Sequence, residues 1–156
     1  MLTLKSPTLK DGQPIPARNA RAGDNVSPEL MWSDPPPGTR SFALVLEDAD
    51  ASEPAFRQWV IYDVHRARRH LPETGSRSRA EEGLPHGVNA FGNLHYDGPE
   101  PPAGDPPHTY RFRLFALSVP TLGLEPRPHA ADVMDGVRAN LLGEAELTGT
   151  YQVIPV

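Results

Sequence analysis

The chain has no cysteine among its 156 residues. Disulfide bonds, zinc sites built from thiolates and cysteine nucleophiles are therefore excluded. No stretch approaches the run of about 20 apolar residues that a membrane-spanning helix needs, which argues against an integral membrane protein. The first residues, Met1 to Pro7, lack a basic segment followed by an apolar one. No signal peptide is therefore expected, and a cytoplasmic location is predicted.

Lysine is scarce, and positive charge as a whole is outnumbered by negative charge. Lys5 and Lys10 are the only lysines among 15 basic residues, and 20 Asp and Glu bring the net charge to −5. A protein that neutralises the phosphates of DNA or RNA needs a basic face. The composition therefore argues against a nucleic-acid-binding protein.

Proline and glycine are abundant, with 19 and 13 residues. They separate clear apolar runs, which is typical of a β-rich domain with many turns rather than of a disordered chain. The chain shows no internal repeat and no linker, and 38% of its residues are hydrophobic. Residues 1–156 are therefore expected to form a single domain with its own core.

Three segments have the pattern of strands. Residues 41–47 are apolar on both alternating faces, as in a strand that is covered on both sides. Residues 58–64 are rich in β-branched and aromatic side chains. Residues 110–117 alternate apolar side chains with Arg111 and Arg113, which predicts one face toward the core. The side chains expected in the core are Phe42, Leu44, Leu46, Trp59, Phe112 and Leu114.

The hydrophobic period then changes from two to that of a helix. Apolar residues recur at i, i+4 and i+8, which predicts an amphipathic helix over 129–143 that ends at Gly143. The final residues, 150–154, return to a strand pattern. The fold class is therefore mainly β, with one late helix that covers an edge or a face. The recurring residues of the helix are Val133, Val137 and Leu141.

Residues 65–86 differ from the rest of the chain, because five arginines and three glutamates occur there with few apolar residues. A basic ligand-binding loop is one interpretation of this segment. A solvated excursion from the fold is the interpretation that the composition favours.

Strong catalytic signatures are missing, since the chain has no Gly-rich phosphate loop, no His-Glu-x-x-His and no Gly-x-Ser-x-Gly. A first candidate group is the run from Glu47 to Asp50, which closes the first apolar strand. On an extended backbone Asp48 and Asp50 share a face. They could order a turn, line a binding pocket or act as acid and base, or hold a metal ion. The spacing favours the turn.

A second candidate pair opens the strand that includes residues 110–117. His108 and Tyr110 lie two residues apart and share a face, so they could offer a titratable donor and a phenol to an anion or polar ligand. A histidine at a strand end is more commonly a plain surface residue. The segment 91–104 is rich in Gly and Pro, which predicts a rigid loop whose backbone can approach a ligand.

Together, these segments resemble the phosphatidylethanolamine-binding protein family, which includes the Raf kinase inhibitor protein and small bacterial relatives. The pattern Gly-Pro-x-Pro-Pro-x-Gly followed by His-x-Tyr is far more specific than any of its parts, and the similarity runs nearly end to end. The segments that carry the resemblance are Asp48-Ala-Asp50-Ala51, Gln58-Trp-Val60, Tyr96-Asp-Gly-Pro-Glu-Pro-Pro-Ala-Gly104 and His108-Thr-Tyr110-Arg-Phe112.

The resemblance implies an antiparallel Greek-key β-sandwich with one or two peripheral helices. It also implies a small, rigid pocket at one end of the sandwich that takes phosphate-like and other small anions. Ala49 and Ser52 stand where the family usually has proline, and Gln58 stands where it usually has histidine. The candidate ligand-binding residues, transferred by position, are Asp48, Asp50, Gln58, Gly98, Pro99, His108 and Tyr110.

The function predicted from this resemblance is binding of a small anion or phospholipid headgroup, without catalysis and without a metal ion or cofactor. Eukaryotic relatives regulate kinases, but that role would rest here on analogy of fold alone. One alternative is a hydrolase or lyase that uses Asp48 and His108 as acid and base. Another is a pure interaction module that uses residues 65–86. Because bacterial relatives often pair, the resemblance also implies a homodimer.

Overall fold

The computed structural model describes residues 1–53, 56–75 and 84–155, and most of its regular structure is β-strand. Neighbouring strands of the central sheet run antiparallel, except for the short parallel pair of β2 and β10. The strands of this sheet, in spatial order, are β2 (Gln13–Pro14), β10 (Leu141–Tyr151), β9 (His108–Leu117), β5 (Ser41–Asp48) and β6 (Phe56–His65).

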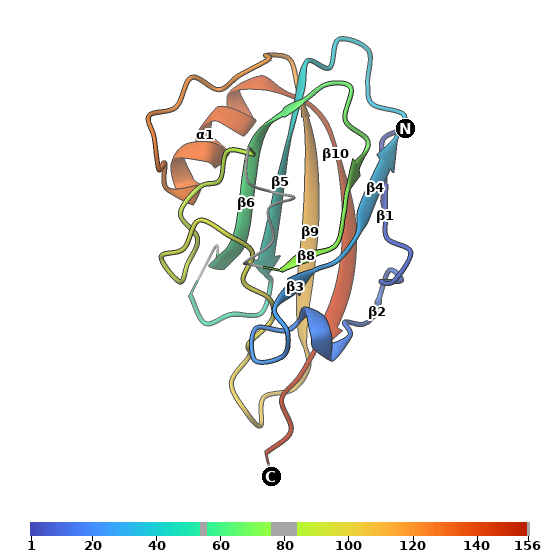
Figure 1. The fold of residues 1–156 in the computed structure, drawn as a ribbon, viewed down its shortest axis with the longest axis vertical. Helices are drawn as coiled ribbons and strands as arrows, with labels where there is room; N and C mark the ends of the chain where they lie inside the picture. Colours follow the sequence, from blue (N-terminus) through green and yellow to red (C-terminus); the bar gives the residue numbers. More distant parts are fainter. Residues whose placement is uncertain (54–55, 76–83, 156) are drawn as a thin grey trace.

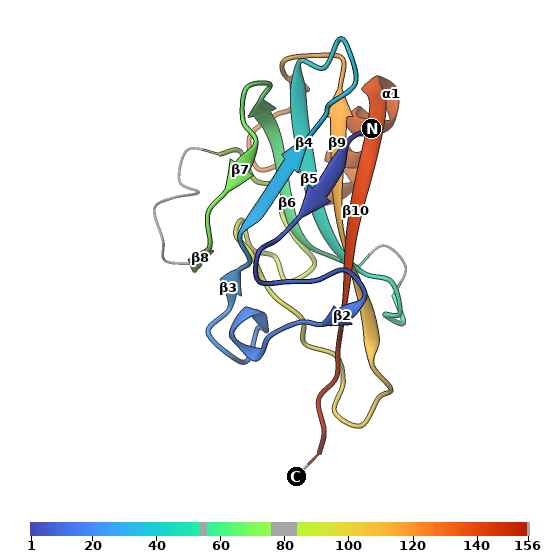
Figure 2. The same ribbon diagram turned by 90° about the vertical axis from the view of Figure 1, so that its right-hand side faces the viewer.

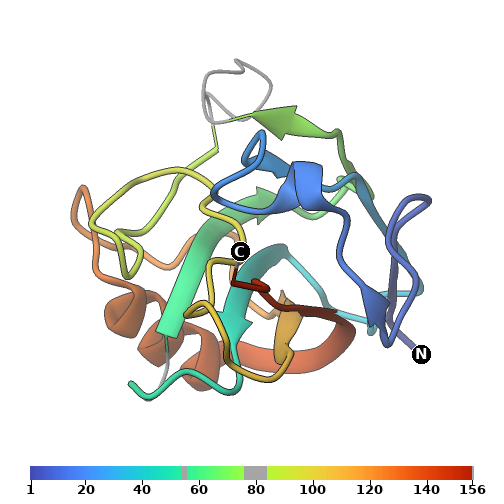
Figure 3. The same ribbon diagram turned by 90° about the horizontal axis from the view of Figure 1, so that it is seen from below.

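Smaller elements cover both faces of the central sheet. Seen from below, α1 lies on one side of it and the sheet that contains β4 lies on the other (Figure 3). The view in Figure 2 shows β1 and β4 in front of β5 and β9. The remaining elements are a sheet of β1 (Thr3–Lys5), β4 (Leu30–Ser33) and β7 (His70–Leu71), a pair of β3 (Val26–Ser27) and β8 (Thr74–Gly75), the 3-10 helix η1 (Ala17–Asn19) and the α-helix α1 (Ala130–Asn140).

Strand β5 lies between two hydrophobic cores. Phe42 and Leu44 pack in the core beneath β1 and β4, whereas Ala43 and Val45 pack in the core beneath α1. The uninterrupted apolar run of this strand, predicted to be covered on both sides, is therefore confirmed. The six predicted core side chains are all at most 1% exposed, and burial of each contributes roughly 1.5–3 kcal/mol.

Strand β9 confirms the predicted alternation. Tyr110 and Phe112 are buried toward the core beneath β1 and β4. Arg111 and Arg113 lie on the opposite face, where both form ion pairs with Glu47. The arginines are thus partly buried over a covered face and are neutralised there.

The predicted end of the helix is wrong. Val133 and Val137 are buried as expected, but α1 ends at Asn140 and Leu141 already belongs to β10. Leu141 pairs with Leu117 of β9 and its side chain is 42% exposed. Ladder pairing along the edge of the central sheet therefore overrides the helical period of these residues.

Gly143 lies inside β10 instead of ending the helix. It sits beside a register shift of the β9–β10 pair, and a Cβ atom at this position would lie 2.9 Å from the Cγ atom of Pro36. The strand predicted at 150–154 is confirmed only for Thr150 and Tyr151, because β10 ends at Tyr151. The tail beyond it contacts another loop, since the N–H of Gly104 donates a hydrogen bond of 2.9 Å to the carbonyl of Val153.

The arginine-rich segment 65–86 falls partly on residues 76–83, which lie outside the described residues. Its described part contains the two-residue strands β7 and β8. The turn at 65–69 is largely exposed, which agrees with the solvated excursion for that part.

The topology brings the two candidate groups to the same end of the sandwich. Strand β5 ends at Asp48, and Asp48 lies opposite Tyr110 in the antiparallel ladder with β9. The loops at 49–53 and 97–107 extend from this end, at the bottom of Figure 1. In the described ranges, no helix is long and apolar enough to cross a membrane.

Candidate functional site

A cavity of about 340 Å³ opens at the lower end of the sandwich. The end of β5, the loop that follows it, the start of β6, the proline-rich loop and the start of β9 all contribute to its wall. The residues that line it are Asp48, Asp50, Ala51, Ser52, Glu53, Phe56, Glu100, Pro101, Pro102, Asp105 and His108.

His108 lies between two carboxylates. Its Nδ1 atom is 2.7 Å from Oδ2 of Asp48, and its Nε2 atom is 3.0 Å from Oδ2 of Asp105. A neutral imidazole has only one N–H, whereas ionised carboxylates can only accept hydrogen bonds. Both contacts are therefore satisfied together only when the ring is protonated.

Two opposing influences act on the pKa of His108. Burial, the largest influence, lowers the pKa, but the hydrogen bonds and negative charges of Asp48 and Asp105 outweigh it and raise the pKa above the ordinary histidine value. The ring is thus held as a cation over a wider pH range than a free histidine.

Asp48 and Asp50 order the turn after β5. The Oδ1 atom of Asp48 accepts a hydrogen bond of 2.9 Å from the N–H of Asp50. The Oδ2 atom of Asp50 accepts one of 2.6 Å from the N–H of Thr109 in β9. The turn-forming interpretation is therefore confirmed, and both carboxylates also line the cavity.

Tyr110 lies beneath the cavity. Its ring stacks beside His108 with a centroid distance of 6.4 Å. The residue is completely buried, and its hydroxyl group has no hydrogen-bond partner among the described residues. Burial, and after it the charge of Asp48, raises the pKa of this phenol, which therefore remains a potential donor at all physiological pH values.

Besides Tyr110, three further candidate residues do not line the cavity, and their described contacts support the loop at 97–99. Gln58 is 1% exposed and donates from Nε2 to the carbonyl of Gly98 at 2.6 Å. A Cβ atom on Gly98 would lie 1.9 Å from the carbonyl oxygen of Asn19, so only glycine fits there. The carbonyl of Pro99 accepts a hydrogen bond from the N–H of Arg21.

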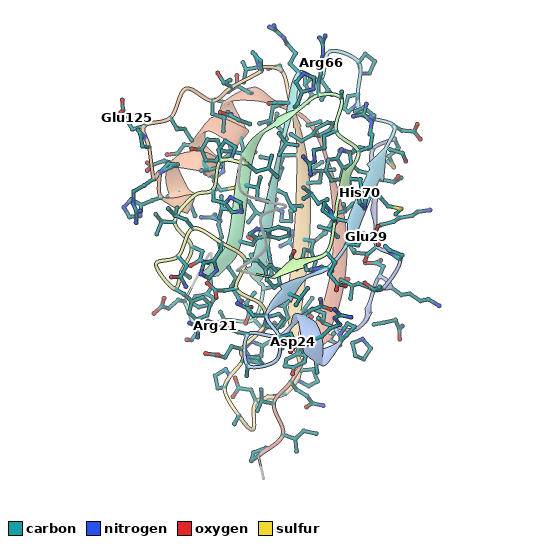
Figure 4. All side chains as sticks on the ribbon, in the orientation of Figure 1. Arg21, Asp24, Glu29, Arg66, His70 and Glu125 are labelled. Atoms are coloured by element: carbon teal, nitrogen blue, oxygen red, sulfur yellow. The ribbon has the colours of Figure 1, made fainter. Side chains whose placement is uncertain are left out.

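A buried carboxylate that the sequence analysis missed organises the same loop. Asp97 is 2% exposed and accepts hydrogen bonds from the side-chain amides of Asn89 at 2.8 Å and Asn93 at 2.9 Å. Arg21 pairs with Asp97 at 3.3 Å and with Glu100 at 3.0 Å, on the lower left of Figure 4. Asn89 and Asn93 precede Asp97 by eight and four residues in the same loop, whereas Arg21 comes from a distant segment that no local spacing could indicate.

The cavity wall is strongly acidic. Among the described residues, five carboxylates line it and His108 is the one basic side chain of the lining. Glu53, Glu100 and Asp105 are not among the site residues predicted from the sequence. The i, i+3 spacing of Asp105 and His108 is the signal that could have identified Asp105. In the described ranges, no group of three or more acidic or histidine side chains is arranged to hold a metal ion.

Comparisons with known proteins identify relatives of this chain. A "UPF0098 protein" of Aquifex aeolicus is 38% identical over 147 residues, which cover 94% of this chain and 86% of that protein. Another from Methanothermobacter thermautotrophicus is 36% identical over 155 residues, covering 97% of this chain and 99% of that protein. LppC of Mycobacterium tuberculosis, named as a lipoprotein, is 36% identical over 97% of this chain and 72% of its own length.

The fold also matches solved structures. Escherichia coli YbcL, described as a member of the mammalian PEBP family, superimposes with a TM-score of 0.91 at 29% identity, over 97% of this chain and 98% of that one. A homologue from Chlamydia trachomatis, CT736, gives a TM-score of 0.83 at 29% identity, over 97% of both chains. The family model for phosphatidylethanolamine-binding proteins matches residues 5–152. The chain therefore belongs to the phosphatidylethanolamine-binding protein family.

Proposed function

We propose that this chain is a non-enzymatic binding protein whose acidic cavity holds a small phosphorylated amine, with phosphoethanolamine as the simplest example. The observation that carries the proposal is the position of His108 between Asp48 and Asp105 in a cavity lined by carboxylates. The name of the family points to the same class of headgroup.

The acidic wall suits the ammonium group of such a ligand. An anion without an ammonium group would meet five carboxylates and one histidine of the described lining, and the described ion pair of Glu100 is with Arg21. Like charges at close range in a partly desolvated cavity are unfavourable. A zwitterion therefore fits this cavity better than the simple anion expected from the sequence.

The phosphate group has a donor available at His108. Asp105 holds the Nε2 atom of the ring, but its side chain is 44% exposed and can turn toward solvent. A phosphate oxygen that replaces this carboxylate would accept the same N–H hydrogen bond, while Asp48 keeps the ring oriented through Nδ1. The hydroxyl group of Tyr110 lies beneath the ring, near Asp48, without a well-aligned partner among the described residues.

Calorimetric titration with phosphoethanolamine, ethanolamine and inorganic phosphate at pH 7 tests the proposal. Phosphoethanolamine should bind at least about tenfold more tightly than either fragment, because charge-assisted hydrogen bonds contribute about 1.5–3 kcal/mol each. His108→Asn should abolish this preference. His70→Asn is the matched control, because His70 also contacts a carboxylate, that of Glu29, but lies outside the cavity. The absence of binding by all three compounds would overturn the proposal.

The hydrogen bond between Asp48 and His108 also favours an acid–base enzyme as a second candidate, because a carboxylate that orients an imidazole is a feature of hydrolases. The described partner of Nε2 is Asp105 rather than a hydroxyl group that could act as nucleophile. Release of phosphate from phosphoethanolamine, lost in His108→Asn, would support the enzyme.

We further propose a cytoplasmic location and a homodimeric state for this chain. The location rests on the sequence analysis, and cell fractionation tests it against the lipoprotein name of LppC. A regulatory role toward kinases rests on the family resemblance alone and carries no expectation for a particular partner.

A further inference from the structure

A second cavity, of about 490 Å³, lies at the end of the sandwich opposite the acidic cavity. We call it the basic pocket. Arg40 precedes β5, and Asp63 to Arg66 form the end of β6 and its turn. Figure 4 shows Arg66 at this upper end. The residues that line the basic pocket are Arg40, Asp63, His65, Arg66, Pro120 and Thr121.

Two guanidinium groups of the basic pocket have no partner in the described part of the chain. Arg40 and Arg66 form no ion pair there, and their side chains donate no hydrogen bond. Arg111 and Arg113 of β9, by contrast, are neutralised by glutamates. The charge of the basic pocket is therefore available to a ligand.

The turn that carries Arg66 is held in place by its own residues. Arg69 donates from NH1 to the carbonyl of Arg66 at 2.6 Å and to that of Arg68 at 2.9 Å. The N–H of Arg68 donates to the carbonyl of His65 at 2.9 Å. The backbone position of Arg66 is thus fixed while its guanidinium group stays unused.

His65 adds a donor in either protonation state. Its Nδ1 atom lies 3.0 Å from the N–H of Ala67, which makes Nδ1 the acceptor in the neutral ring. The neutral ring therefore carries its proton on Nε2, and Nε2 can donate to a ligand oxygen. Thr121, also in the lining, adds a hydroxyl group.

The single carboxylate in the lining of the basic pocket is already engaged. Oδ1 of Asp63 accepts a hydrogen bond of 2.8 Å from the N–H of Leu122. Asp63 has a φ of +52° and lies within the register shift between β5 and β6, an irregularity of the kind that often redirects a side chain next to a functional site. Its contact holds the segment after β9 so that Thr121 reaches the pocket wall.

We propose that the basic pocket is a second ligand site, which binds a phosphate monoester group through Arg40, Arg66 and Nε2 of His65. Guanidinium groups match the tetrahedral oxygens of phosphate and can bind two of them at once. With two unpaired arginines against the one carboxylate of Asp63, the described lining keeps an excess of positive charge that favours an anion. The group can belong to a free phosphate monoester or to the headgroup of phosphatidic acid in a membrane.

The test maps amide chemical shifts in nitrogen-15 NMR spectra during titration with inorganic phosphate and with glycerol 3-phosphate at pH 7. Shifts should occur at residues 39–41, 63–67 and 118–122. Arg40→Gln and Arg66→Gln should each weaken binding about tenfold, the effect of one charge-assisted hydrogen bond. Arg138→Gln is the matched control, since it removes one exposed arginine elsewhere, and it should change the affinity less than twofold.

A second arm separates the two sources of the phosphate group. Vesicles of phosphatidylcholine with and without phosphatidic acid are sedimented with the parent chain and with the double variant Arg40→Gln/Arg66→Gln. Retention that needs both phosphatidic acid and the two arginines indicates a membrane ligand. Binding of glycerol 3-phosphate without retention on vesicles indicates a free monoester.

The proposal is overturned if none of these probes gives a signal that depends on Arg40 and Arg66. Equal weakening by Arg138→Gln would also overturn it, because that result means unspecific attraction of charge. Both arginines are exposed, so circular dichroism should show an unchanged fold in each variant. Since His108→Asn leaves the basic pocket intact, failure at the acidic cavity and failure here are distinguishable.

Discussion

His108 shows how one side chain can be set by its neighbours before any ligand arrives. Its ring bridges a nearly buried carboxylate, that of Asp48, and a half-exposed one, that of Asp105. The buried side fixes the orientation of the ring and the exposed side can exchange. The ring of His108 is therefore a charged donor in a fixed orientation, and a ligand can replace one of its two partners. Such a precisely placed polar group suits recognition of a polar headgroup.

The stability of the protein should therefore depend on pH through His108. The raised pKa of the folded state means that the charged ring stabilises the fold fully below the ordinary histidine pKa of about 6.5. This contribution is lost as pH rises through the folded-state pKa. Urea unfolding should show the parent chain exceeding His108→Gln in stability more at pH 6 than at pH 9. A difference that stays constant or grows with pH would contradict the proposed bridge.

Asp105 should compete with the ligand phosphate for Nε2 of His108. Asp105→Asn removes a negative charge from the cavity, while the amide oxygen can still accept from the ring. We expect phosphate and phosphoethanolamine to bind several-fold more tightly to this variant in calorimetric titrations. Asp24→Asn removes an exposed carboxylate outside the cavity lining and should leave the affinity unchanged. Weaker binding to Asp105→Asn would show that this carboxylate holds the ligand.

Tyr110 carries a buried hydroxyl group without a partner, which costs about 1–3 kcal/mol. Tyr110→Phe removes this group and keeps the ring. The variant should be as stable as the parent or more stable in thermal unfolding without ligand, and should bind phosphoethanolamine more weakly. A clear loss of stability without ligand would show that the hydroxyl group is already satisfied in the free protein.

At the scale of elements, alternation and flanking turns predicted strands β5, β6 and β9 well, because their patterns reflect which faces are covered. The junction of α1 and β10 could not be predicted in the same way. Leu141 continues the helical period, yet the open edge of β9 takes it as a strand residue. Long-range pairing of this kind leaves no local trace in the sequence.

The residues of the candidate site likewise fall into those that local sequence patterns could identify and those that depend on long-range contacts. Asp48 and His108 end and begin neighbouring strands, so the sequence pattern together with the family resemblance could identify them. Glu53, Glu100 and Asp105 reach the cavity from loops. Their positions depend on contacts such as that of Asp97 with Arg21, which join segments far apart in the sequence.

The loop at 97–99 should depend on Gln58 for its stability. Gln58→Ala leaves the buried carbonyls of Asp97 and Gly98 without its donor, which should cost about 1–3 kcal/mol in urea unfolding. Gln13→Ala, on an exposed residue of β2, is the control and should cost far less. An unchanged unfolding free energy in Gln58→Ala would mean that the loop is held without this residue.

At the scale of the whole molecule, the sandwich separates two charge environments. The acidic cavity and the basic pocket lie at opposite ends of strands that are up to eleven residues long. On the outer side of β10, described pairing with β2 is confined to Gly149 and Thr150. Leu141 and Leu142 at its start are about 40% exposed.

The homodimer expected from the family should be visible in sedimentation velocity over a range of concentrations. The exposed start of β10 is a candidate contact, so Leu142→Glu should shift the equilibrium toward monomer. Ile154→Glu, at an exposed residue outside any strand, should not. A monomer at all accessible concentrations would contradict the expectation.

The hydrogen bond between Gly104 and Val153 has a practical consequence for handling this protein. The tail that follows β10 is tied to the loop that carries Asp105, so an affinity tag fused after the last residue would pull on the rim of the acidic cavity. The N-terminus lies well away from this rim (Figure 1). Affinities measured with a C-terminal tag should therefore differ from those measured with an N-terminal tag, and the second kind reports the undisturbed cavity.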